Sequence, residues 1–171
     1  WPVAWEVNAI HATDIITRHL RGGEEIENFH TIDLFSHAVH LTRQLDKTSP
    51  TASSHLRKTW AKLGLPHLQQ FDNDDVFRGG HTHPRVIGQV VRLCLFCGIE
   101  VLFTPLYDPQ RNYHIETFHS LWRQAFWSRY RFANLAPKSH SSCPGTITIT
   151  TRPPCTAAPP HKSTLAAPSP P

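Results

Sequence analysis

We predict an α/β fold in which a mixed, five-stranded sheet is flanked by helices. Two observations support this prediction. Residues 1–132 alternate between segments with the period-two hydrophobicity of strands and segments with the helical spacing of apolar residues. Their order is three strands, then helix, strand, helix, strand and helix. Three successive strands followed by alternating helices and strands imply both antiparallel and parallel pairing in one sheet.

Turn residues delimit the three N-terminal strands. Residues 4–17 alternate loosely between apolar and polar side chains, and they end before the hairpin-type turn at residues 21–24 (RGGE). Two further strand patterns follow at residues 25–34 and 38–45. Because short turns connect the three segments, we expect them to pair antiparallel.

The rest of residues 1–132 carries helix and strand signals in alternation. Thr48, Ser49 or Thr51 can cap the first helix, and Gly64 ends it. The final helix is long and amphipathic. The expected elements are a helix at 49–63, a strand at 67–71, a helix at 84–96, a strand at 99–103 and a helix at 112–130. This order is that of a ribonuclease-H-like fold.

Residues 133–171 differ sharply in composition from the rest of the chain. They contain nine Pro, no Asp or Glu and no aromatic residue. Such a segment cannot bury enough apolar surface to offset the entropy lost on ordering. We therefore expect two parts, a folded domain over residues 1–132 and a tail over residues 133–171 that is disordered or translated out of frame.

Charge and hydropathy restrict the function only weakly. The formal net charge is +4, but residues 1–132 hold all 13 acidic residues and 14 of the 17 Lys and Arg, so charge alone does not predict DNA binding. The chain has no run of eighteen apolar residues and no signal-peptide pattern at its start. We expect no membrane association and a cytoplasmic or nucleoid-associated location, not secretion.

Two patterns that suggest metal binding have simpler interpretations. Cys94 and Cys97 have the C-x-x-C spacing, but they lie in an apolar run, and no second pair follows to complete a zinc site. We interpret both as small hydrophobic core residues. His81 and His83 form a lone H-x-H in a Gly-rich loop, and we interpret them as solvated residues.

Three segments, in this order, resemble the integrase catalytic core family, the D,D-E group of retroviral integrases and insertion-sequence transposases. The first is the hydrophobic-Asp-x-x-Ser strand end of residues 31–37. The second is the Gly-x-Pro turn of residues 64–66, followed by a strand and Asp72-Asn73. The third is Phe-x-Pro at residues 103–105, followed by Asn112 four residues before Glu116. The resemblance covers about residues 5–132.

The resemblance implies a metal-dependent polynucleotidyl transferase of DNA integration or transposition. Asp72 at a strand end and Glu116 in the first turn of a helix are then metal-binding catalytic residues. Carboxylates suit Mg²⁺ or Mn²⁺, and two such ions activate a water or a 3′-hydroxyl for phosphodiester transfer. The implied partners are DNA ends, target DNA and further copies of the chain, with no small-molecule substrate. In the family, Asn112 matches a residue that orients the Glu or contacts the backbone.

The first acidic position has two candidates. Trp5-Glu6-Val7-Asn8 has the shape of the family's Trp-x-hydrophobic-Asp motif, but Asn8 stands where the acid is expected. Asp14 is the other candidate, and the acid actually present. Both positions have the same parity, so on a continuous strand both side chains point to one face. Asp33 is interpreted as structural.

Two family glycines are replaced, by Asp74 after Asp72-Asn73 and by Tyr113 after Asn112, which puts turns requiring positive φ in doubt. An alternative function follows, a catalytically inactive remnant that binds nucleic acid or a partner chain. A ribonuclease-H-type hydrolase of RNA–DNA hybrids shares the same metal chemistry. Residues with side chains suited to DNA contact are Arg111, His114, His119, Arg123, Arg129 and Arg131.

Overall fold

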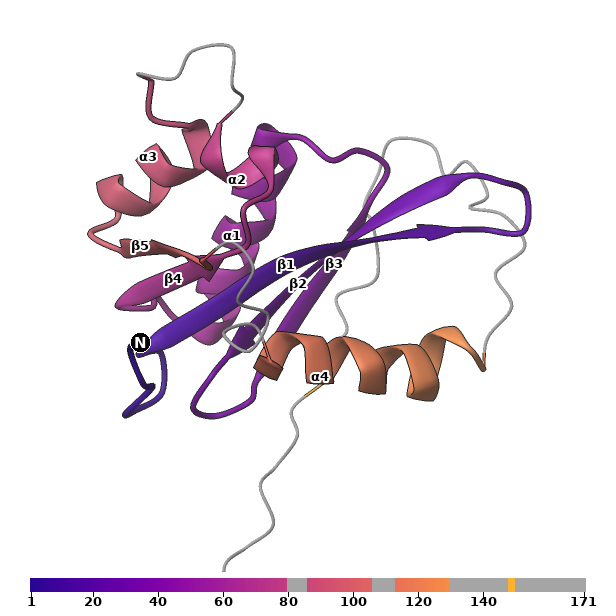
Figure 1. Cartoon of the computed structure of the whole chain (residues 1–171), viewed down its shortest axis with the longest axis horizontal. Helices are drawn as coiled ribbons and strands as arrows, with labels where there is room; N and C mark the ends of the chain where they lie inside the picture. The colour runs from indigo at the N-terminus through magenta and orange to yellow at the C-terminus, as the bar shows by residue number, and fades with distance from the viewer. Residues whose placement is uncertain (80–85, 106–112, 130–147, 150–171) are drawn as a thin grey trace, which may run out of the picture.

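The computed structural model describes residues 1–79, 86–105, 113–129 and 148–149, and one mixed sheet lies at its centre (Figure 1). The strand order in the sheet is β5-β4-β1-β2-β3-β6. β1, β2 and β3 pair antiparallel, whereas β4 pairs parallel to β1 and β5 parallel to β4. The strands are β1 (Ile10–His19), β2 (Glu25–Asp33), β3 (Val39–Gln44), β4 (Leu68–Phe71), β5 (Glu100–Phe103) and β6 (Thr148–Ile149).

Helices cover both faces of this sheet. The first three lie together on one face, and α4 lies alone on the other (Figure 1). None of the helices in the described ranges is long and apolar enough to span a membrane. The helices are α1 (Ser49–Leu63), α2 (Asp75–Arg78), α3 (Gln89–Phe96) and α4 (Tyr113–Trp122), and α4 continues into a π-helical turn, η2 (Arg123–Trp127).

The predicted mixed five-stranded sheet with flanking helices is confirmed, and its differences from the structure are local. β1 begins at Ile10 rather than at residue 4, because Asn8 has a φ of 64° and interrupts the extended backbone. The short helix α2, capped by Asp74, was not predicted because four residues show no periodicity. β6 pairs with β3 inside the segment predicted to be a tail.

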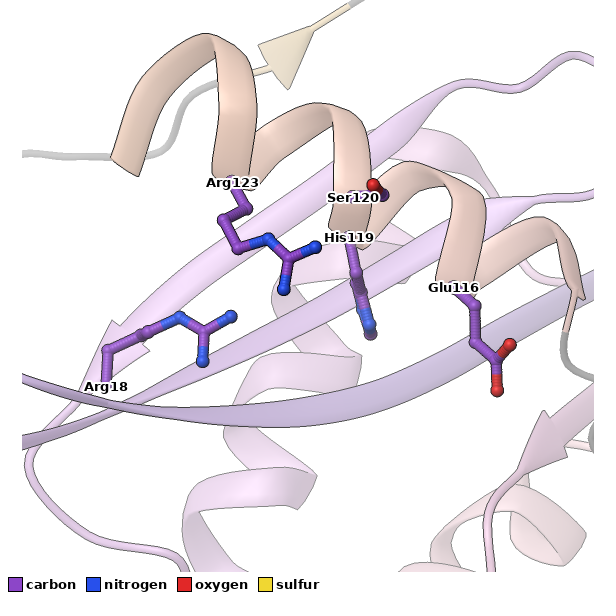
Figure 2. Close-up of a pocket in the computed structure, with 5 residues that line it drawn as sticks. All are labelled: Arg18, Glu116, His119, Ser120 and Arg123. Carbon is purple, nitrogen blue, oxygen red and sulfur yellow. The ribbon is translucent and has the colours of Figure 1, made fainter. Parts of the chain in front are cut away.

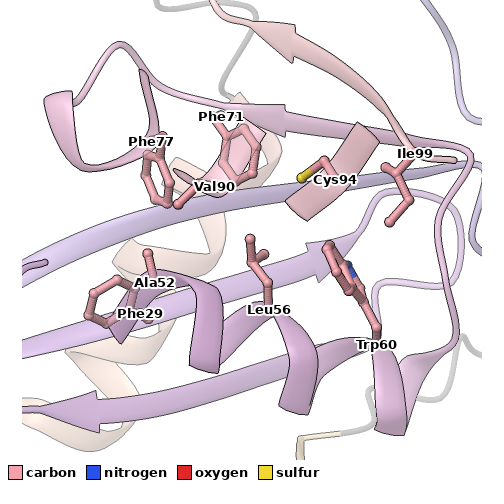
Figure 3. Packing of buried hydrophobic residues seen from close by; sticks show 9 residues of the cluster. All are labelled: Phe29, Ala52, Leu56, Trp60, Phe71, Phe77, Val90, Cys94 and Ile99. Carbon is pink, nitrogen blue, oxygen red and sulfur yellow. The ribbon is translucent and has the colours of Figure 1, made fainter. Parts of the chain in front are cut away.

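The larger hydrophobic core lies between the sheet and the first three helices (Figure 3). Cys94 is fully buried there and Cys97 packs against the same cluster, as the sequence predicted. Burial raises the pKa of the Cys94 thiol to about 12, so the thiol stays protonated and unreactive at neutral pH. The members of this core are Phe29, Ala52, Leu56, Trp60, Phe71, Phe77, Val90, Cys94 and Ile99.

A smaller core on the opposite face holds α4 against the sheet. Ile115 of α4 is 1% exposed and packs with Ala12, Ile32 and Val39, while Phe118 lies at the edge of the cluster. Burying such side chains contributes roughly 1.5–3 kcal/mol each. This contact fixes which side of α4 faces β1, and so which helix residues lie over the strand that carries Asp14.

A buried polar network lies between the sheet and α1. Both ring nitrogens of His55 are hydrogen bonded, Nε2 to Thr31 Oγ1 at 2.9 Å and Nδ1 to Thr42 Oγ1 at 2.8 Å. His40 Nδ1 is bonded to Thr59 Oγ1 at 2.7 Å, and the rings of His40 and His55 stack with centroids 5.5 Å apart. Because the rings share this space at full burial, the network requires neutral imidazoles.

Candidate active site

Two carboxylates meet where β1 and β4 run side by side. The parallel register pairs Thr13 with Phe71, so Asp14 and Asp72 follow at the same level of the sheet. Burial and the neighbouring charge of Asp72 raise the pKa of Asp14 to about 7. Burial also raises the pKa of Asp72, partly offset by the hydrogen bond that its carboxylate accepts from the Asp74 backbone N–H. The two carboxyl groups therefore form an acidic pair in which the charge of Asp72 favours the protonated form of Asp14.

The turn after β4 holds Asp72 in place. The Asp74 N–H donates to Asp72 Oδ1 at 3.2 Å, and the Asn73 side-chain amide donates to the carbonyl oxygen of Thr104. Asp74 has a φ of −64°, and its carboxylate caps α2 by accepting from Val76 N at 3.0 Å. The replacement of the family's Gly by Asp74 therefore requires no left-handed backbone.

A lysine compensates part of the negative charge at this turn. The Lys47 ammonium forms an ion pair with Asp74, and both side chains are partly buried. Despite the cost of burial, the pair with Asp74 raises the pKa of Lys47, and the charge of Lys47 acts in turn on Asp14 and Asp72. The acidic pair thus has one fixed cation at its border.

Glu116 belongs to α4, whose residue His119 packs against Asp14. It lies in the first turn of the helix and is exposed to solvent. Together with Arg18, His119, Ser120 and Arg123 it lines a cavity of about 200 Å³ between α4 and the strands (Figure 2). Tyr113 starts α4 in helical conformation, so its replacement of the family's Gly is compatible with the fold.

His119 connects α4 to the acidic pair. Its Nδ1 lies 3.6 Å from Asp14 Oδ2, which is longer than a hydrogen bond. Burial and the charge of Arg18 lower the pKa of His119 to about 4, so the contact joins a neutral imidazole to Asp14 and is no ion pair at neutral pH. The sequence suggested His119 as a DNA contact, whereas the structure packs it against Asp14 and the ring of His30.

The three acidic residues are not all within reach of one another. Among the described residues, no group of three His, Cys, Asp or Glu side chains is arranged to hold a metal ion. Asp14 and Asp72 do fit a divalent cation, because they are buried carboxylates of like charge, which a hard cation neutralises. Glu116 lies on α4 and lines a cavity whose walls include neither Asp14 nor Asp72.

Asn8, the alternative first acidic position, lies away from the acidic pair. It precedes β1, and its carbonyl oxygen accepts from His67 N at 2.9 Å. Its side-chain oxygen contacts His11 Nε2 at 2.9 Å, and its amide packs on Gly64. The expectation that Asn8 and Asp14 share one face of a continuous strand is wrong, because the strand begins only at Ile10.

We expect Gly64→Ala to destabilise the protein by about 2–3 kcal/mol, more than Gly23→Ala at about 1 kcal/mol. Both glycines have positive φ, 103° and 84°, but an added Cβ at Gly64 lies only 2.5 Å from the Asn8 amide nitrogen, whereas Gly23 has open space. Urea unfolding of both variants measures the difference. Equal costs would show that Asn8 does not pack tightly on Gly64, and adding Asn8→Ala should reduce the cost at Gly64 alone.

The remaining residues singled out in the sequence lie in different environments or outside the described residues. The Asp33 carboxylate accepts from the backbone N–H groups of Phe35 and Ser36, both at 3.3 Å, and from the Ser36 hydroxyl, which agrees with its structural interpretation. His114, Arg123 and Arg129 are exposed. Outside the described residues lie His81, His83, Arg111, Asn112 and Arg131.

Arg18 is a residue that the sequence analysis missed. It stands four residues after Asp14 on β1, which places both side chains on the same face of the strand. The sequence shows this spacing of Asp14 and Arg18. It does not show that Arg18 lies near Arg123, because Arg123 belongs to a helix more than 100 residues later.

Comparison with solved structures identifies this fold. The chain superimposes on the HTLV-2 integrase catalytic core domain in complex with magnesium, in a trimeric form, with a TM-score of 0.61 and 16% identity over 74% of each chain. It also superimposes on the BIV integrase catalytic core domain with a TM-score of 0.54 and 15% identity, covering 72% of this chain and 74% of that one. The fold is that of an integrase catalytic core.

A third similar structure contains this integrase fold within a larger assembly. It is the simian T-cell lymphotropic virus intasome in complex with the PP2A regulatory subunit B56 gamma, with a TM-score of 0.60 and 21% identity. The match covers 71% of this chain but only 41% of the simian chain. No family model matches the sequence, and no curated protein matches it either.

Proposed function

We propose that this chain is the catalytic core of a polynucleotidyl transferase acting in DNA integration or transposition, with Asp14, Asp72 and Glu116 as its acidic residues. The observation that carries the proposal is the pair of partly buried carboxylates where the parallel pairing of β1 and β4 ends, with Asp14 within β1 and Asp72 directly after β4. The integrase-core fold supports it, because one of the similar structures is a core domain in complex with magnesium.

In this proposal Asp14 and Asp72 hold Mg²⁺ or Mn²⁺, and Glu116 completes the set from α4. The bound ions supply activation of a water or 3′-hydroxyl and neutralisation of charge on the leaving oxygen. With its pKa raised to about 7, Asp14 is partly protonated near neutral pH while no cation is bound, and it must release that proton for the cation to bind. His119 packs against Asp14 and limits its rotation, and Lys47 holds the turn that carries Asp72.

The joining of short labelled duplex DNA to plasmid in Mn²⁺ tests this proposal. We expect Asp14→Asn to remove strand transfer, whereas Asn8→Asp should leave it unchanged because Asn8 lies before β1. Isothermal titration with Mn²⁺ at pH 7 provides a second measurement, and Asp14→Asn should abolish the accompanying proton release. Strand transfer that appears only in Asn8→Asp would refute the assignment of Asp14. Cleavage of RNA–DNA hybrids without DNA joining would favour a hydrolase.

One observation favours the second candidate function, a nucleic-acid-binding remnant without catalysis. Glu116 is not gathered with Asp14 and Asp72 into a metal-binding group within the described ranges. A remnant predicts DNA binding without Mn²⁺-dependent joining, and Glu116→Gln would then change neither property. Loss of joining in Glu116→Gln would exclude this candidate.

A further inference from the structure

An ion pair between two loops lies at the border of the acidic pair. Lys47 belongs to the connection between β3 and α1, and Asp74 belongs to the turn between β4 and α2. The Lys47 ammonium pairs with the Asp74 carboxylate, and the two side chains are 35% and 21% exposed. Asp74 stands where the resembled integrase motif has Gly, so that motif does not supply this ion pair.

The connection that carries Lys47 is held in place by contacts of its neighbours. The Thr48 side chain caps α1 by accepting from Thr51 N at 3.4 Å. Ser49 Oγ donates to the carbonyl oxygen of Val76 at 2.8 Å, which ties the start of α1 to α2. Because neither contact uses the Lys47 side chain, both should persist when that side chain is replaced.

The Asp74 carboxylate is fully engaged outside the acidic pair. It accepts from Val76 N at 3.0 Å as the cap of α2, and its other oxygen faces the Lys47 ammonium. The Asp74 backbone N–H donates to Asp72 Oδ1 at 3.2 Å. Asp74 therefore joins the lysine to Asp72 and is not itself free to bind a metal ion.

The charge of Lys47 reaches both carboxyl groups of the acidic pair. Burial raises the pKa of Asp14 and of Asp72, and the charge of Lys47 lowers the pKa of both. A fixed ammonium here offsets part of the repulsion between two ionised carboxylates, but it repels a divalent cation that binds to them. Lys47 thus stabilises the metal-free protein and weakens metal binding, whereas a lysine with a structural role alone would stabilise both forms equally.

We propose that Lys47, held by Asp74, is a built-in counter-cation of the acidic pair, against whose charge a divalent cation must bind. The inference rests on the proposed function, in which Asp14 and Asp72 hold the metal. Lys47 touches neither the metal nor DNA in this role. It sets the affinity of the site for the ion, and so it is not a catalytic residue.

Isothermal titration of the full chain with Mn²⁺ at pH 8 tests this inference without DNA. We expect Lys47→Met, which keeps the length of the side chain and removes its charge, to tighten Mn²⁺ binding about 5- to 10-fold. Lys47→Arg keeps the charge and should stay within about twofold of the unaltered chain. Lys62→Met is the matched control, because Lys62 is an exposed lysine in the last turn of α1, roughly 20 Å along the helix from Ser49.

Urea unfolding in EDTA and in excess Mn²⁺ separates the charge of Lys47 from a structural role. In EDTA, Lys47→Met should be less stable than the unaltered chain. It should then gain more stability from Mn²⁺, because an ion that binds more tightly stabilises the folded state more. A loss of the same size under both conditions would make Lys47 a structural residue and overturn the inference.

A double-variant cycle tests the part played by Asp74. Asp74→Asn should weaken Mn²⁺ binding about 5- to 10-fold, because it removes a negative charge and leaves that of Lys47. The variant with both Lys47→Met and Asp74→Asn should regain the affinity of the unaltered chain, since the two charges cancel. A loss above about a hundredfold that the double variant does not regain would make Asp74 a metal ligand and overturn the inference.

The remaining outcomes are equally decisive. Unchanged or weaker Mn²⁺ binding by Lys47→Met would overturn the inference, as would the absence of Mn²⁺ binding in both chains. Should Lys47→Met fail to fold, NMR of the unaltered chain replaces it. The Lys47 Cε resonance should shift on addition of Mg²⁺ and that of Lys62 should not, and equal behaviour of the two would overturn the inference.

Failure of this inference is distinguishable from failure of the proposed function. If Lys47→Met binds Mn²⁺ more tightly but Asp14→Asn keeps strand transfer, only the proposed function fails. If Asp14→Asn removes strand transfer but Lys47→Met binds Mn²⁺ no more tightly than the unaltered chain, only the role of Lys47 fails.

Discussion

At pH 4 the protein is expected to be largely unfolded at 25 °C, because it buries several histidines in neutral form. The pKa values of His11, His40 and His119 fall from 6.5 to about 4 through burial, and those of His30 and His55 fall well below 6.5. In the unfolded chain these groups take up protons below pH 6.5, whereas in the folded protein they do so only near pH 4 or lower. The contribution of these neutral histidines to the free energy of unfolding is therefore complete above pH 6.5, and it is lost as the pH falls from 6.5 to 4.

The stability that the buried histidines lose at low pH exceeds the stability that Asp14 regains. Each histidine with a folded pKa of about 4 costs about 3 kcal/mol at pH 4, and the stability of a typical domain is only about 5–15 kcal/mol. Asp14 acts in the opposite direction, because its folded pKa of about 7 lies above the unfolded value of 3.8. It regains about 3 kcal/mol over the same pH range, less than the histidines together lose.

Circular dichroism during an acid titration measures this transition. His30→Phe should move the midpoint to lower pH, because both ring nitrogens of His30 lack hydrogen-bond partners in the described residues and its ring packs on Trp122 and Phe118. His19→Phe, at an exposed position, is the control. A protein that stays folded at pH 4, or an unchanged midpoint in His30→Phe, would contradict the explanation.

Asp72→Asn is expected to reduce strand transfer by at least about a thousandfold while making the protein more stable at pH 8. The loss follows because metal stabilisation of the transition state is worth several kcal/mol, and each 1.4 kcal/mol is about tenfold in rate. The stability gain follows because the charge of Asp72 raises the pKa of Asp14, so two buried carboxylates repel each other once both are ionised. Removing one of them should contribute about 1–2 kcal/mol above pH 7.

Urea unfolding at pH 8 measures the gain in stability, and an NMR titration of the Asp14 carboxyl measures the change in its pKa. Both measurements are independent of activity. The pKa of Asp14 should fall from about 7 towards its ordinary value in Asp72→Asn. Glu100→Gln removes an exposed negative charge from β5 and should change neither quantity. An unchanged pKa of Asp14 would show that the two carboxylates do not interact.

Local patterns were sufficient to predict most of the elements, and they nominated two of the three candidate acidic residues. Asp72 and Glu116 were nominated because their flanking motifs are contiguous in sequence, and the parallel strands β4 and β5 were predicted as short strands at residues 67–71 and 99–103. Residue types alone predicted the end of α1 at Gly64 and limited its N-cap to Thr48, Ser49 or Thr51, of which the structure shows Thr48. These features depend on residues within a few positions of one another, so the sequence contains them directly.

Whether Asn8 lies on the same strand as Asp14 could be seen only in the tertiary structure. Both positions have the same parity, and only the packing of Asn8 on Gly64 and His67 shows that the strand begins after it. The pairing of Asp14 with Asp72 likewise depends on the register between strands 58 residues apart in sequence.

The amino-acid sequence by itself determined the mixed sheet, the order of its helices and the apolar surroundings of Cys94 and Cys97, and it nominated Asp72 and Glu116 as candidate acidic residues. Only the tertiary structure decided that Asp14 stands beside Asp72, that His119 is buried against Asp14, and that Arg18 faces Arg123. The physical reason is that periodicity and capping arise from neighbours along the chain. Charge pairs, burial and shifted pKa values arise from residues that the sheet register and the packing of α4 bring together from distant positions.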